Sequence, residues 1–480
     1  MTDTRSFYID GAWVAPATPR DFEVFDPSTE DVCATISLGT ETDTDAAVAA
    51  AEAAFEGWGY GTDPRERIAL VRRILATYEK RAEDLAQAMS LEMGAPIDFA
   101  RGSQVGAGSW HIANFLKAAE DFQFTRPLGP HAPNDRILMD PAGVCALITP
   151  WNWPMNQITL KVIPALIAGC TLVLKPSEIA PLSGLVWAEI MDEAGTPRGV
   201  FNLVNGDGAG VGTRLSCHPD VDMVSFTGSA RAGILISKNA ADTLKRVHLE
   251  LGGKGANIVF ADSDEKAVKR GAIHCFNNTG QSCNAPTRML VERGIYDDAV
   301  EIARETAENT RVASAHEAGR HIGPLVSAAQ FDKVQGLIQK GIDEGARLVA
   351  GGTGRPEGVN RGWFVRPTVF ADVTNDMTIA QEEIFGPVLS IIPFEGEEEA
   401  IRIANDTAYG LTNYVQSQDG AKRNRVARRL RSGMVEMNGQ GRGAGSPFGG
   451  MKASGNGREG GVWGIEDFCE VKAVSGWAAE

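Results

Sequence analysis

A single cysteine among small and amide residues is the first candidate for chemistry in this sequence. Gly280 precedes Cys283 by three positions and Pro286 follows it by three, within Gly-Gln-Ser-Cys-Asn-Ala-Pro. Glycine permits close backbone approach and proline stops a helix, so we expect a loop that holds a thiol within reach of a ligand. A free thiol is mostly protonated at pH 7 and needs a helper to act as a nucleophile. Without one, a buried structural cysteine is the simpler interpretation.

Glu250 is a candidate base for that thiol or for a water molecule. It ends a predicted strand at 247–251 and is followed by paired glycines at 252 and 253. A carboxylate buried at the end of an apolar strand is costly, and burial raises its pKa toward that of a useful base. The alternative is a glutamate that turns to solvent or pairs with a lysine.

Asn152 is a candidate donor to an oxyanion. It stands in Thr149-Pro150-Trp151-Asn152-Trp153-Pro154, a loop that two prolines and two tryptophans make rigid. A fixed side-chain amide can stabilise the negative oxygen of a tetrahedral intermediate. An asparagine that merely caps a helix is the alternative.

Two other strand ends carry groups that suit a nucleotide. The segment 175–178 reads Lys-Pro-Ser-Glu, and the carboxylate of Glu178 could accept from both hydroxyls of an adenine ribose. Thr227-Gly228-Ser229 opens a helix whose free N–H groups suit a pyrophosphate. The glycine-rich segment 206–212 lacks the G-x-G-x-x-G spacing and taken alone predicts a loop and a helix start.

The elements that position these groups alternate in type from Val144 onward. Predicted strands cover 144–148, 171–175, 201–204, 223–226 and 247–251, and predicted helices cover 157–168, 183–194 and 230–244. This alternation predicts a parallel, doubly wound sheet with ligands at the carboxyl ends of its strands.

The remaining segments frame this region. A turn at 10–11 sits in a small β start, and helices are predicted at 44–57, 64–92 and 98–121. A second alternating region has strands at 257–260, 288–291 and 390–393 with helices between them. The tail at 470–474 alternates apolar and polar residues with no neighbour in sequence, so we expect it to pair elsewhere or with another subunit.

Composition narrows the class of protein. The 480 residues suffice for two or three domains, and the net charge of −16 argues against nucleic-acid or anionic-membrane partners. We expect neither a signal peptide nor a membrane span. Seven cysteines without Cys-x-x-Cys, and no His-x-x-x-His, favour reduced thiols in the cytoplasm and no metal site.

Seven motifs in order along the chain resemble the aldehyde dehydrogenase superfamily. They are Trp151-Asn152-Trp153-Pro154, Lys175-Pro176-Ser177-Glu178, Phe226-Thr227-Gly228-Ser229, Glu250-Leu251-Gly252-Gly253-Lys254, Gly280-Gln281-Ser282-Cys283, Glu382-Glu383-Ile384-Phe385-Gly386-Pro387 and Pro447-Phe448-Gly449-Gly450. The family usually has Phe where Trp153 stands and often Cys where Ser282 stands. Both departures flank the candidate site and remove no catalytic group.

The resemblance implies a role for each matched residue. Cys283 matches the nucleophile, Glu250 the general base and Asn152 the oxyanion donor, while Lys161 and Glu459 match a pair proposed to carry protons away from the base. The implied cofactor-binding residues are Thr149, Pro150, Trp151, Lys175, Ser177, Glu178, Gly208, Phe226, Gly228, Ser229, Leu251, Gly252, Glu383 and Phe385. The implied substrate-binding residues are Trp153, Asn156, Gln157, Arg442 and Phe448.

The implied reaction is oxidation of an aldehyde to a carboxylic acid, with NAD preferred over NADP. Cys283 attacks the aldehyde, hydride leaves to NAD, and water activated by Glu250 hydrolyses the thioester. We expect a polar or acidic aldehyde, because Arg442 stands where members that prefer aliphatic aldehydes often carry an aromatic residue; whether it clamps a carboxylate or faces solvent stays open.

The resemblance also implies an α/β fold in three parts. A nucleotide-binding domain takes 1–120 and 141–249, a catalytic domain takes 250–440, and an oligomerisation arm takes 121–140 and 462–480, with 441–461 returning to line the active site. Dimers or tetramers are expected. The rival interpretations are a CoA-acylating dehydrogenase, a non-catalytic structural protein and a cofactor-free cysteine hydrolase. Glu250 argues against the acylating enzyme, and the presence of Glu250, Cys283 and Asn152 together argues against a structural protein. The 175–178 motif argues against a hydrolase that needs no cofactor.

Overall fold

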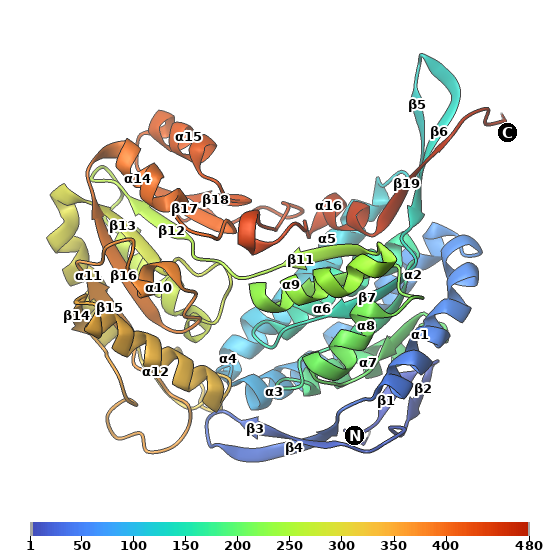
Figure 1. The fold of residues 1–480 in the computed structure, drawn as a ribbon, viewed down its shortest axis with the longest axis horizontal. Helices are drawn as coiled ribbons and strands as arrows, with labels where there is room; N and C mark the ends of the chain where they lie inside the picture. The colour runs from blue at the N-terminus through green and yellow to red at the C-terminus, as the bar shows by residue number, and fades with distance from the viewer. Residues whose placement is uncertain (1–2, 479–480) are drawn as a thin grey trace.

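The computed structural model describes residues 3–478, arranged as two lobes side by side with a β arm projecting from one of them (Figure 1). Residues 1, 2, 479 and 480, at the outer ends of the predicted nucleotide-binding domain and arm, lie outside the described residues. Within 3–478, no helix has both the length and the apolar character needed to cross a membrane.

The first lobe is built on a seven-stranded sheet. Its strands are, in order across the sheet, β11 (Arg246–Glu250), β10 (Met223–Thr227), β7 (Val144–Ile148), β8 (Thr171–Lys175), β9 (Phe201–Leu203), β1 (Phe7–Ile9) and β2 (Ala12–Val14). The five strands from β11 to β9 are parallel, which confirms the predicted parallel sheet. Their order brings the carboxyl ends of β11, β10, β7 and β8 together along one edge.

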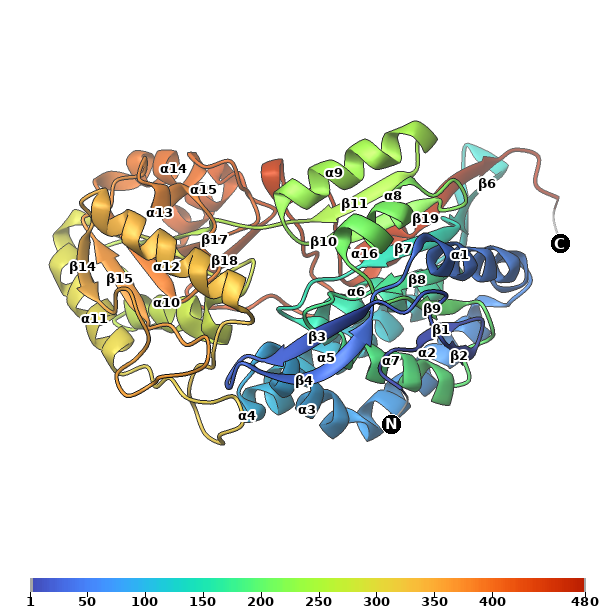
Figure 2. The same cartoon turned by 60° about the horizontal axis from the view of Figure 1, so that its bottom comes forward.

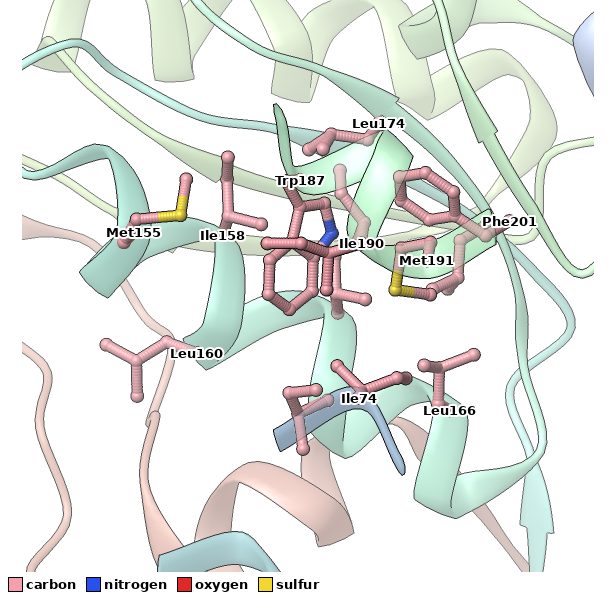
Figure 3. Packing of buried hydrophobic residues seen from close by; sticks show 14 of the residues in the cluster. Ile74, Met155, Ile158, Leu160, Leu166, Leu174, Trp187, Ile190, Met191 and Phe201 are labelled. Atoms are coloured by element: carbon pink, nitrogen blue, oxygen red, sulfur yellow. The ribbon is translucent and has the colours of Figure 1, made fainter. Parts of the chain in front are cut away.

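Helices cover both faces of this sheet, because alternate residues of each strand enter different cores (Figure 2). One face bears α2 (Pro64–Lys80), α3 (Ala82–Met93), α5 (Val105–Glu120), α6 (Pro154–Ala168) and α7 (Leu182–Glu193). The other bears α1 (Glu41–Phe55), α8 (Thr213–Cys217) and α9 (Ala230–Ala240). Trp187 of α7 lies among Ile158, Leu174 and Ile190 (Figure 3), so α6 and α7 are fixed against β8 by aliphatic packing. Each such fully buried side chain contributes roughly 1.5–3 kcal/mol.

Several predicted helix boundaries were wrong for local reasons. The single helix predicted at 64–92 is two, because the backbone bends at Arg81, whose guanidinium pairs with Asp84 and with Glu189 of α7. The helix predicted from Gln157 begins at Pro154, which suits a first helical position. The helix predicted to end at 244 ends at Ala240, and a short 3-10 turn (Ala241–Thr243) follows.

Two more boundary differences involve π-helical turns. The helix predicted at 98–121 starts as α4 (Ile97–Phe99), passes through a π-helical turn (Ala100–Gln104) and continues as α5. The helix predicted at 44–57 is α1, followed by a π-helical turn (Glu56–Tyr60). The glycine-rich segment at 206–212 is a loop and a π-helical turn (Gly208–Gly212) that leads into α8, as predicted.

The second lobe has its own seven-stranded sheet. Across the sheet the order is β14 (Arg347–Ala350), β15 (Thr368–Ala371), β16 (Val388–Phe394), β13 (Arg288–Glu292), β12 (Ala256–Val259), β17 (Thr412–Gln416) and β18 (Met434–Met437). Only the β14–β15 pair is antiparallel among its described pairs. The helices are α10 (Ala267–Phe276), α11 (Tyr296–Glu308), α12 (Ala328–Asp343), α13 (Thr378–Gln381), α14 (Gly396–Asn405) and α15 (Gly420–Arg429). The sequence had indicated β12, β13 and β16 but not the other four strands.

The tail returns to the first lobe and ends in the arm. After α16 (Gly461–Asp467), the strand β19 (Cys469–Val474) pairs antiparallel with β6 (Ala132–Pro141), which also pairs with β5 (Thr125–Gly129). The tail strand therefore has its partner within the same chain. A separate hairpin of β3 (Asp21–Asp26) and β4 (Asp31–Ser37) lies beside the first lobe (Figure 2).

Candidate active site

A cavity of about 220 Å³ lies where the strand ends of the first lobe face the second lobe. The first lobe contributes Pro150, Trp151, Asn152, Gln157, Thr227, Gly228, Ser229, Leu251 and Gly252 to its lining. The second lobe contributes Cys283, Gln330, Lys333, Glu383 and Phe385. Residues from five of the sequence motifs thus converge on one cavity.

Cys283 follows a strained turn. Asn278, Thr279 and Gly280 have φ values of 50°, 56° and 71°, a conformation that costs non-glycine residues roughly 1–2 kcal/mol each. The Asn278 amide donates to the carbonyls of Asn152 at 3.0 Å and Gln281 at 3.2 Å, which helps to offset this strain. A Cβ at Gly280 would overlap the Gly386 carbonyl, so the turn also requires this glycine.

The Asn152 amide is held against the same turn. Its Nδ2 donates to the Gln281 carbonyl at 2.9 Å, and its own carbonyl accepts from Gln104 Nε2 at 3.1 Å. An amide nitrogen carries two hydrogens, so one remains to donate to a ligand beside Cys283. Asn152 and Cys283 therefore face one cavity from opposite lobes with their spacing fixed by hydrogen bonds.

The Cys283 thiol is protonated in this environment. Burial raises its pKa to about 12, and the carboxylates of Glu383 and Glu250 add to the rise, whereas the Arg442 guanidinium opposes it. A nearby positive charge is what would favour the thiolate. These surroundings favour the thiol over the thiolate, so activation of Cys283 requires a positive charge or a base.

The two departures from the family pattern contact each other. Trp153 Nε1 donates to Ser282 Oγ at 2.8 Å, and the Trp153 ring meets Phe99 edge-on at 5.5 Å. A phenylalanine at 153 would lack the donor and a cysteine at 282 would be a poorer acceptor. Trp153 and Ser282 therefore form a single hydrogen bond, which connects the loop of Asn152 to the residue before Cys283.

The Glu250 side chain is buried beside the Lys161–Glu459 pair. It does not line the cavity, both of its carboxylate oxygens are buried without a hydrogen-bond partner, and burial together with the Glu459 charge raises its pKa well above the usual value. Lys161 Nζ donates to Glu459 Oε1 at 2.8 Å and to Ser225 Oγ at 3.1 Å. The structure thus brings the predicted base close to the predicted Lys161–Glu459 pair.

The predicted nucleotide contacts follow β8 and β10. Lys175 Nζ donates to Glu178 Oε2 at 3.2 Å, and Ser177 is buried beside them. Ser229 caps α9 by accepting from the Ala232 N–H, and a Cβ at Gly228 would overlap the Phe226 ring. Gly208 begins the π-helical turn near this edge of the sheet. A lysine–carboxylate pair and an open helix N-terminus suit an adenine ribose and a pyrophosphate.

The second lobe supplies the groups at the inner end of the cavity. Glu383 Oε1 accepts from the Gly253 N–H at 2.8 Å, and a Cβ at Gly252 would overlap this carboxylate. The rings of Trp151 and Phe385 meet edge-on at 5.4 Å. Thr149, Pro150 and Leu251 follow β7 and β11 at the same edge, and the Thr149 hydroxyl is buried without a partner. These residues fit a dinucleotide that enters along the strand ends.

Among the predicted substrate residues, Gln157 lines the cavity. Asn156 instead contacts a histidine, with its Oδ1 2.8 Å from His111 Nε2. Arg442 Nε donates to Glu436 Oε1 at 3.1 Å, and its guanidinium lies 4.6 Å from the Phe448 ring centre. Arg442 therefore already has a carboxylate partner from the chain.

Some residues that support or extend the site carry no recognisable motif in the sequence. Gln330 Nε2 donates to the carbonyls of Ile384 and Phe385, at 3.1 and 2.8 Å, and so supports Phe385 at φ 59°. Gln330 and Lys333 lie on α12, and no motif marks them. His248 could have been found, because it lies two residues before Glu250 on one strand and so shares its face. Within 3–478, no group of three His, Cys, Asp or Glu side chains is arranged to hold a metal ion.

Comparisons with known proteins agree on one family. The sequence model described as the aldehyde dehydrogenase family matches residues 13–474. A 3-succinoylsemialdehyde-pyridine dehydrogenase from a Pseudomonas species is 51% identical, over 99% of each chain. An aldehyde dehydrogenase crystal structure from Bartonella henselae superposes with a TM-score of 0.98 at 60% identity, covering 99% of this chain and 100% of the other. A cysteine-to-alanine mutant of aldehyde dehydrogenase C from Pseudomonas syringae, complexed with NAD⁺ and octanal, superposes with a TM-score of 0.97 at 48% identity, covering 100% of this chain and 98% of the other.

Proposed function

The chain belongs to the aldehyde dehydrogenase family and is an NAD(P)-dependent oxidoreductase, and we propose that Cys283, Asn152 and Glu250 carry out its reaction. The observation that supports this assignment most directly is the contact between the Asn152 amide and the Gln281 carbonyl, two residues before Cys283. It sets an oxyanion donor beside a thiol at the wall of one cavity.

The reaction then follows from these residues. The Cys283 thiolate attacks the aldehyde carbon, and the Asn152 amide and the Cys283 N–H stabilise the oxyanion. NAD, when bound, supplies the hydride acceptor and a positive ring that favours the thiolate. Loss of hydride leaves a thioester on Cys283, and Glu250 takes a proton from the water that hydrolyses it. For this step the Glu250 carboxylate turns from its buried position toward the cavity.

The test is turnover of an aldehyde panel with NAD, followed by NADH absorbance and by carboxylic-acid release. Cys283→Ala should abolish both signals while NAD binding stays near normal. The matched control is Cys217→Ala, which removes an exposed thiol from the first lobe and should leave turnover unchanged. Appreciable turnover by Cys283→Ala would remove Cys283 as the nucleophile. Formation of an acyl-CoA thioester in place of the carboxylic acid, when coenzyme A is added, would instead favour the acylating alternative.

NAD should be preferred over NADP. The Glu178 carboxylate, paired with Lys175 at the end of β8, is positioned to accept from both ribose hydroxyls, and it would repel a 2′-phosphate. Glu178→Gln should reduce the preference, and kcat/KM for the two cofactors measures it. A wild-type kcat/KM for NADP equal to that for NAD would contradict the role of Glu178.

The substrate is a polar, uncharged aldehyde. The Arg442–Glu436 pair carries no net charge, and it lies against Phe448, so the site offers a guanidinium donor and an aromatic face rather than an unpaired cation. This favours the polar over the acidic alternative expected from the sequence. The Pseudomonas relative is named for a semialdehyde that bears a pyridine ring, which has these properties.

Removing one charge at a time tests the pair. Glu436→Gln leaves Arg442 uncompensated and should raise kcat/KM for a semialdehyde carboxylate relative to its uncharged homologue. Arg442→Gln should shift the ratio in the opposite direction, because Glu436 is then the unpaired charge. Two variants with the wild-type ratio would show that the pair lies outside the substrate path.

Membership of the aldehyde dehydrogenase family also guides our assignment of domains, assembly and location. We assign 1–120 and 141–249 to cofactor binding and 250–440 to catalysis, supported by two sheets with separate cores. The arm, 121–140 with 462–480, assembles the chain into dimers or dimers of dimers, supported by the exposed Leu128 and Val471 on its strands. Seven free cysteines support a reducing compartment such as the cytoplasm. Light scattering of the purified protein tests the assembly.

A further inference from the structure

A buried cluster of ionisable groups lies behind Glu250, on the side away from the cavity. His248 and Glu250 alternate along β11 and so point to the same face of the sheet. Both side chains are almost fully buried, as is Glu459 of the return segment. His248 Nε2 lies 3.9 Å from Glu250 Oε1 and 3.9 Å from Glu459 Oε1. One imidazole nitrogen therefore faces two buried carboxylates.

Most of the polar atoms in this cluster have no hydrogen-bond partner, although Glu459 Oε1 accepts from Lys161. His248 Nε2, both oxygens of Glu250 and Glu459 Oε2 are buried and make no hydrogen bond. Leaving such groups unpaired is costly, on the scale of about 1–3 kcal/mol each. A separation of 3.9 Å is just beyond hydrogen-bond length, so a small rotation of the Glu250 carboxylate closes it. A hydrogen bond between His248 Nε2 and Glu250 can therefore form and break through a small movement of the carboxylate.

The other imidazole nitrogen leads toward solvent. His248 Nδ1 hydrogen-bonds the Asp467 carboxylate at the end of α16, and the Asp467 side chain is 29% exposed. Donation from Nδ1–H to a carboxylate fixes the tautomer in which Nε2 is an acceptor. Arg246 Nη1 donates to the Asp467 carbonyl at 2.6 Å and holds this helix end in place. A Cβ at Gly457 would overlap the imidazole, so the return segment fits closely over the ring.

The Lys161–Glu459 pair does not by itself reach solvent. Lys161 is fully buried and bonded to Glu459 and Ser225, and Glu459 is almost fully buried. Of the three carboxylates around His248, which are Glu250, Glu459 and Asp467, Asp467 is the one with appreciable exposure. The imidazole therefore connects Glu250 to a carboxylate that solvent reaches.

We propose that His248 and Asp467 form the proton exit of the buried base Glu250. The proposal rests on the proposed role of Glu250 in thioester hydrolysis. Protonated Glu250 returns from the cavity and gives its proton to His248 Nε2, the Nδ1 proton passes to Asp467, and water at the surface removes it. The imidazole then regains its first tautomer by rotation or by exchange. One proton enters and one leaves, with no change in oxidation state.

The charges around His248 suit a relay that does not hold its proton. Burial lowers the pKa of His248 well below its usual value, and Lys161 of α6, Arg458 of the return segment and Arg246 of β11 lower it further. Glu250 and Glu459 face Nε2, and Asp467 faces Nδ1. The neutral form of the ring, which can accept a proton, is therefore favoured between transfers.

His248→Gln and Asp467→Asn test the relay, with thermal unfolding measured first to establish that each variant folds. NADH formation in a stopped-flow burst reports acylation and hydride transfer, and quenched-flow release of carboxylic acid reports hydrolysis. We expect an unchanged burst and hydrolysis slower by about tenfold, less than the 10²–10⁴ of direct proton transfer because Lys161–Glu459 remains. Asp467→Glu, which keeps the carboxylate, should restore most of the rate.

The matched control is a second buried histidine paired with an aspartate in the same lobe. His218 Nε2 lies 3.4 Å from Asp45 Oδ1, and His218→Gln and Asp45→Asn should leave both phases unchanged. Wild-type hydrolysis rates in both His248→Gln and Asp467→Asn would overturn the relay, as would equal losses in burst and hydrolysis, which indicate a structural role.

Glu250→Gln in the same experiment separates the two proposals. If it loses hydrolysis selectively and His248→Gln does not, the base stands and the relay falls. If Glu250→Gln loses both phases equally, the proposed role of Glu250 itself fails. A pH profile of hydrolysis that flattens in His248→Gln and Asp467→Asn, but not in the His218 and Asp45 controls, further supports the relay.

Discussion

The two walls of the active-site cavity are built by different means. In the first lobe, Asn152, Ser229 and Gly252 follow directly after parallel strands β7, β10 and β11, whose order alone brings the strand ends together. In the second lobe, Cys283 follows Asn278, and both Asn278 and Phe385 have positive φ. Hydrogen bonds from the side-chain amides of Asn278 and Gln330 support these two positions. Regular structure thus positions the binding groups, whereas stored backbone strain positions the nucleophile.

The largest effect should come from Asn152, which joins the first wall to the turn before Cys283. Asn152→Ala removes the oxyanion donor and the tie to the Gln281 carbonyl, and it should lower kcat by roughly 10²–10³. Asn156→Ala, whose amide contacts His111 instead, is the nearby control and should have a much smaller effect on kcat. A near-normal kcat for Asn152→Ala would remove the asparagine from the oxyanion site.

The next largest effect should fall on the strained wall. Asn278→Ala loses three side-chain hydrogen bonds, one of them accepted from Gln104, and places alanine at φ 50°, so the free energy of unfolding should fall by about 2 kcal/mol or more. Asn278→Gly removes the bonds but relieves the backbone, and it should lose less. Urea denaturation compares the two, and equal losses would show that backbone strain plays no part.

A smaller effect concerns Glu383 of the second wall, whose carboxylate raises the pKa of the Cys283 thiol. The pKa of Cys283 is raised to about 12 by burial and by Glu383, so alkylation of the empty enzyme should be slow at pH 8 and should accelerate throughout the alkaline range. Glu383→Gln should lower the pKa and move this acceleration to lower pH, because more thiolate is then present. Iodoacetamide kinetics against pH measure it. Glu382→Gln is the neighbouring control, and the same shift in both variants would contradict the assignment.

The smallest effect should come from breaking the hydrogen bond between Trp153 and Ser282, which connects the two walls. Trp153→Phe and Ser282→Ala each remove the 2.8 Å bond, and the double variant should lose little more than one of them. The coupling energy should be about 1 kcal/mol, which is about fivefold in kcat/KM. Additive losses would mean that the two residues act separately.

Sequence order gave the first wall more readily than the second. The strands at 144–148, 171–175 and 223–226 were predicted almost to the residue, since apolar runs alternate there with helices. Cys283 was found because its glycine and proline neighbours define a loop. Gln330 and Lys333 could not be found, because they lie on an amphipathic helix whose polar face has no local pattern that indicates a ligand.

The rear of the site was partly accessible to sequence reasoning. Lys161 and Glu459 were predicted only through the family resemblance, since 298 residues separate them. Asp467 could not be linked to His248 at all, because their contact depends on how the tail packs across β11. The strands β14, β15, β17 and β18 of the second lobe were missed although they are as long as β12 and β13; in β17, Thr412, Asn413 and Gln416 leave no apolar run to mark the strand.

The long separation between Lys161 and Glu459 also orders events during synthesis. Chains are made from the N-terminus, and domains fold in that order as they leave the ribosome. Until the return segment emerges, the first lobe carries an ammonium group in its core without its carboxylate, and an unpaired buried charge is strongly destabilising. We therefore expect the first lobe to reach its full stability only after the return segment has placed Glu459 against Lys161.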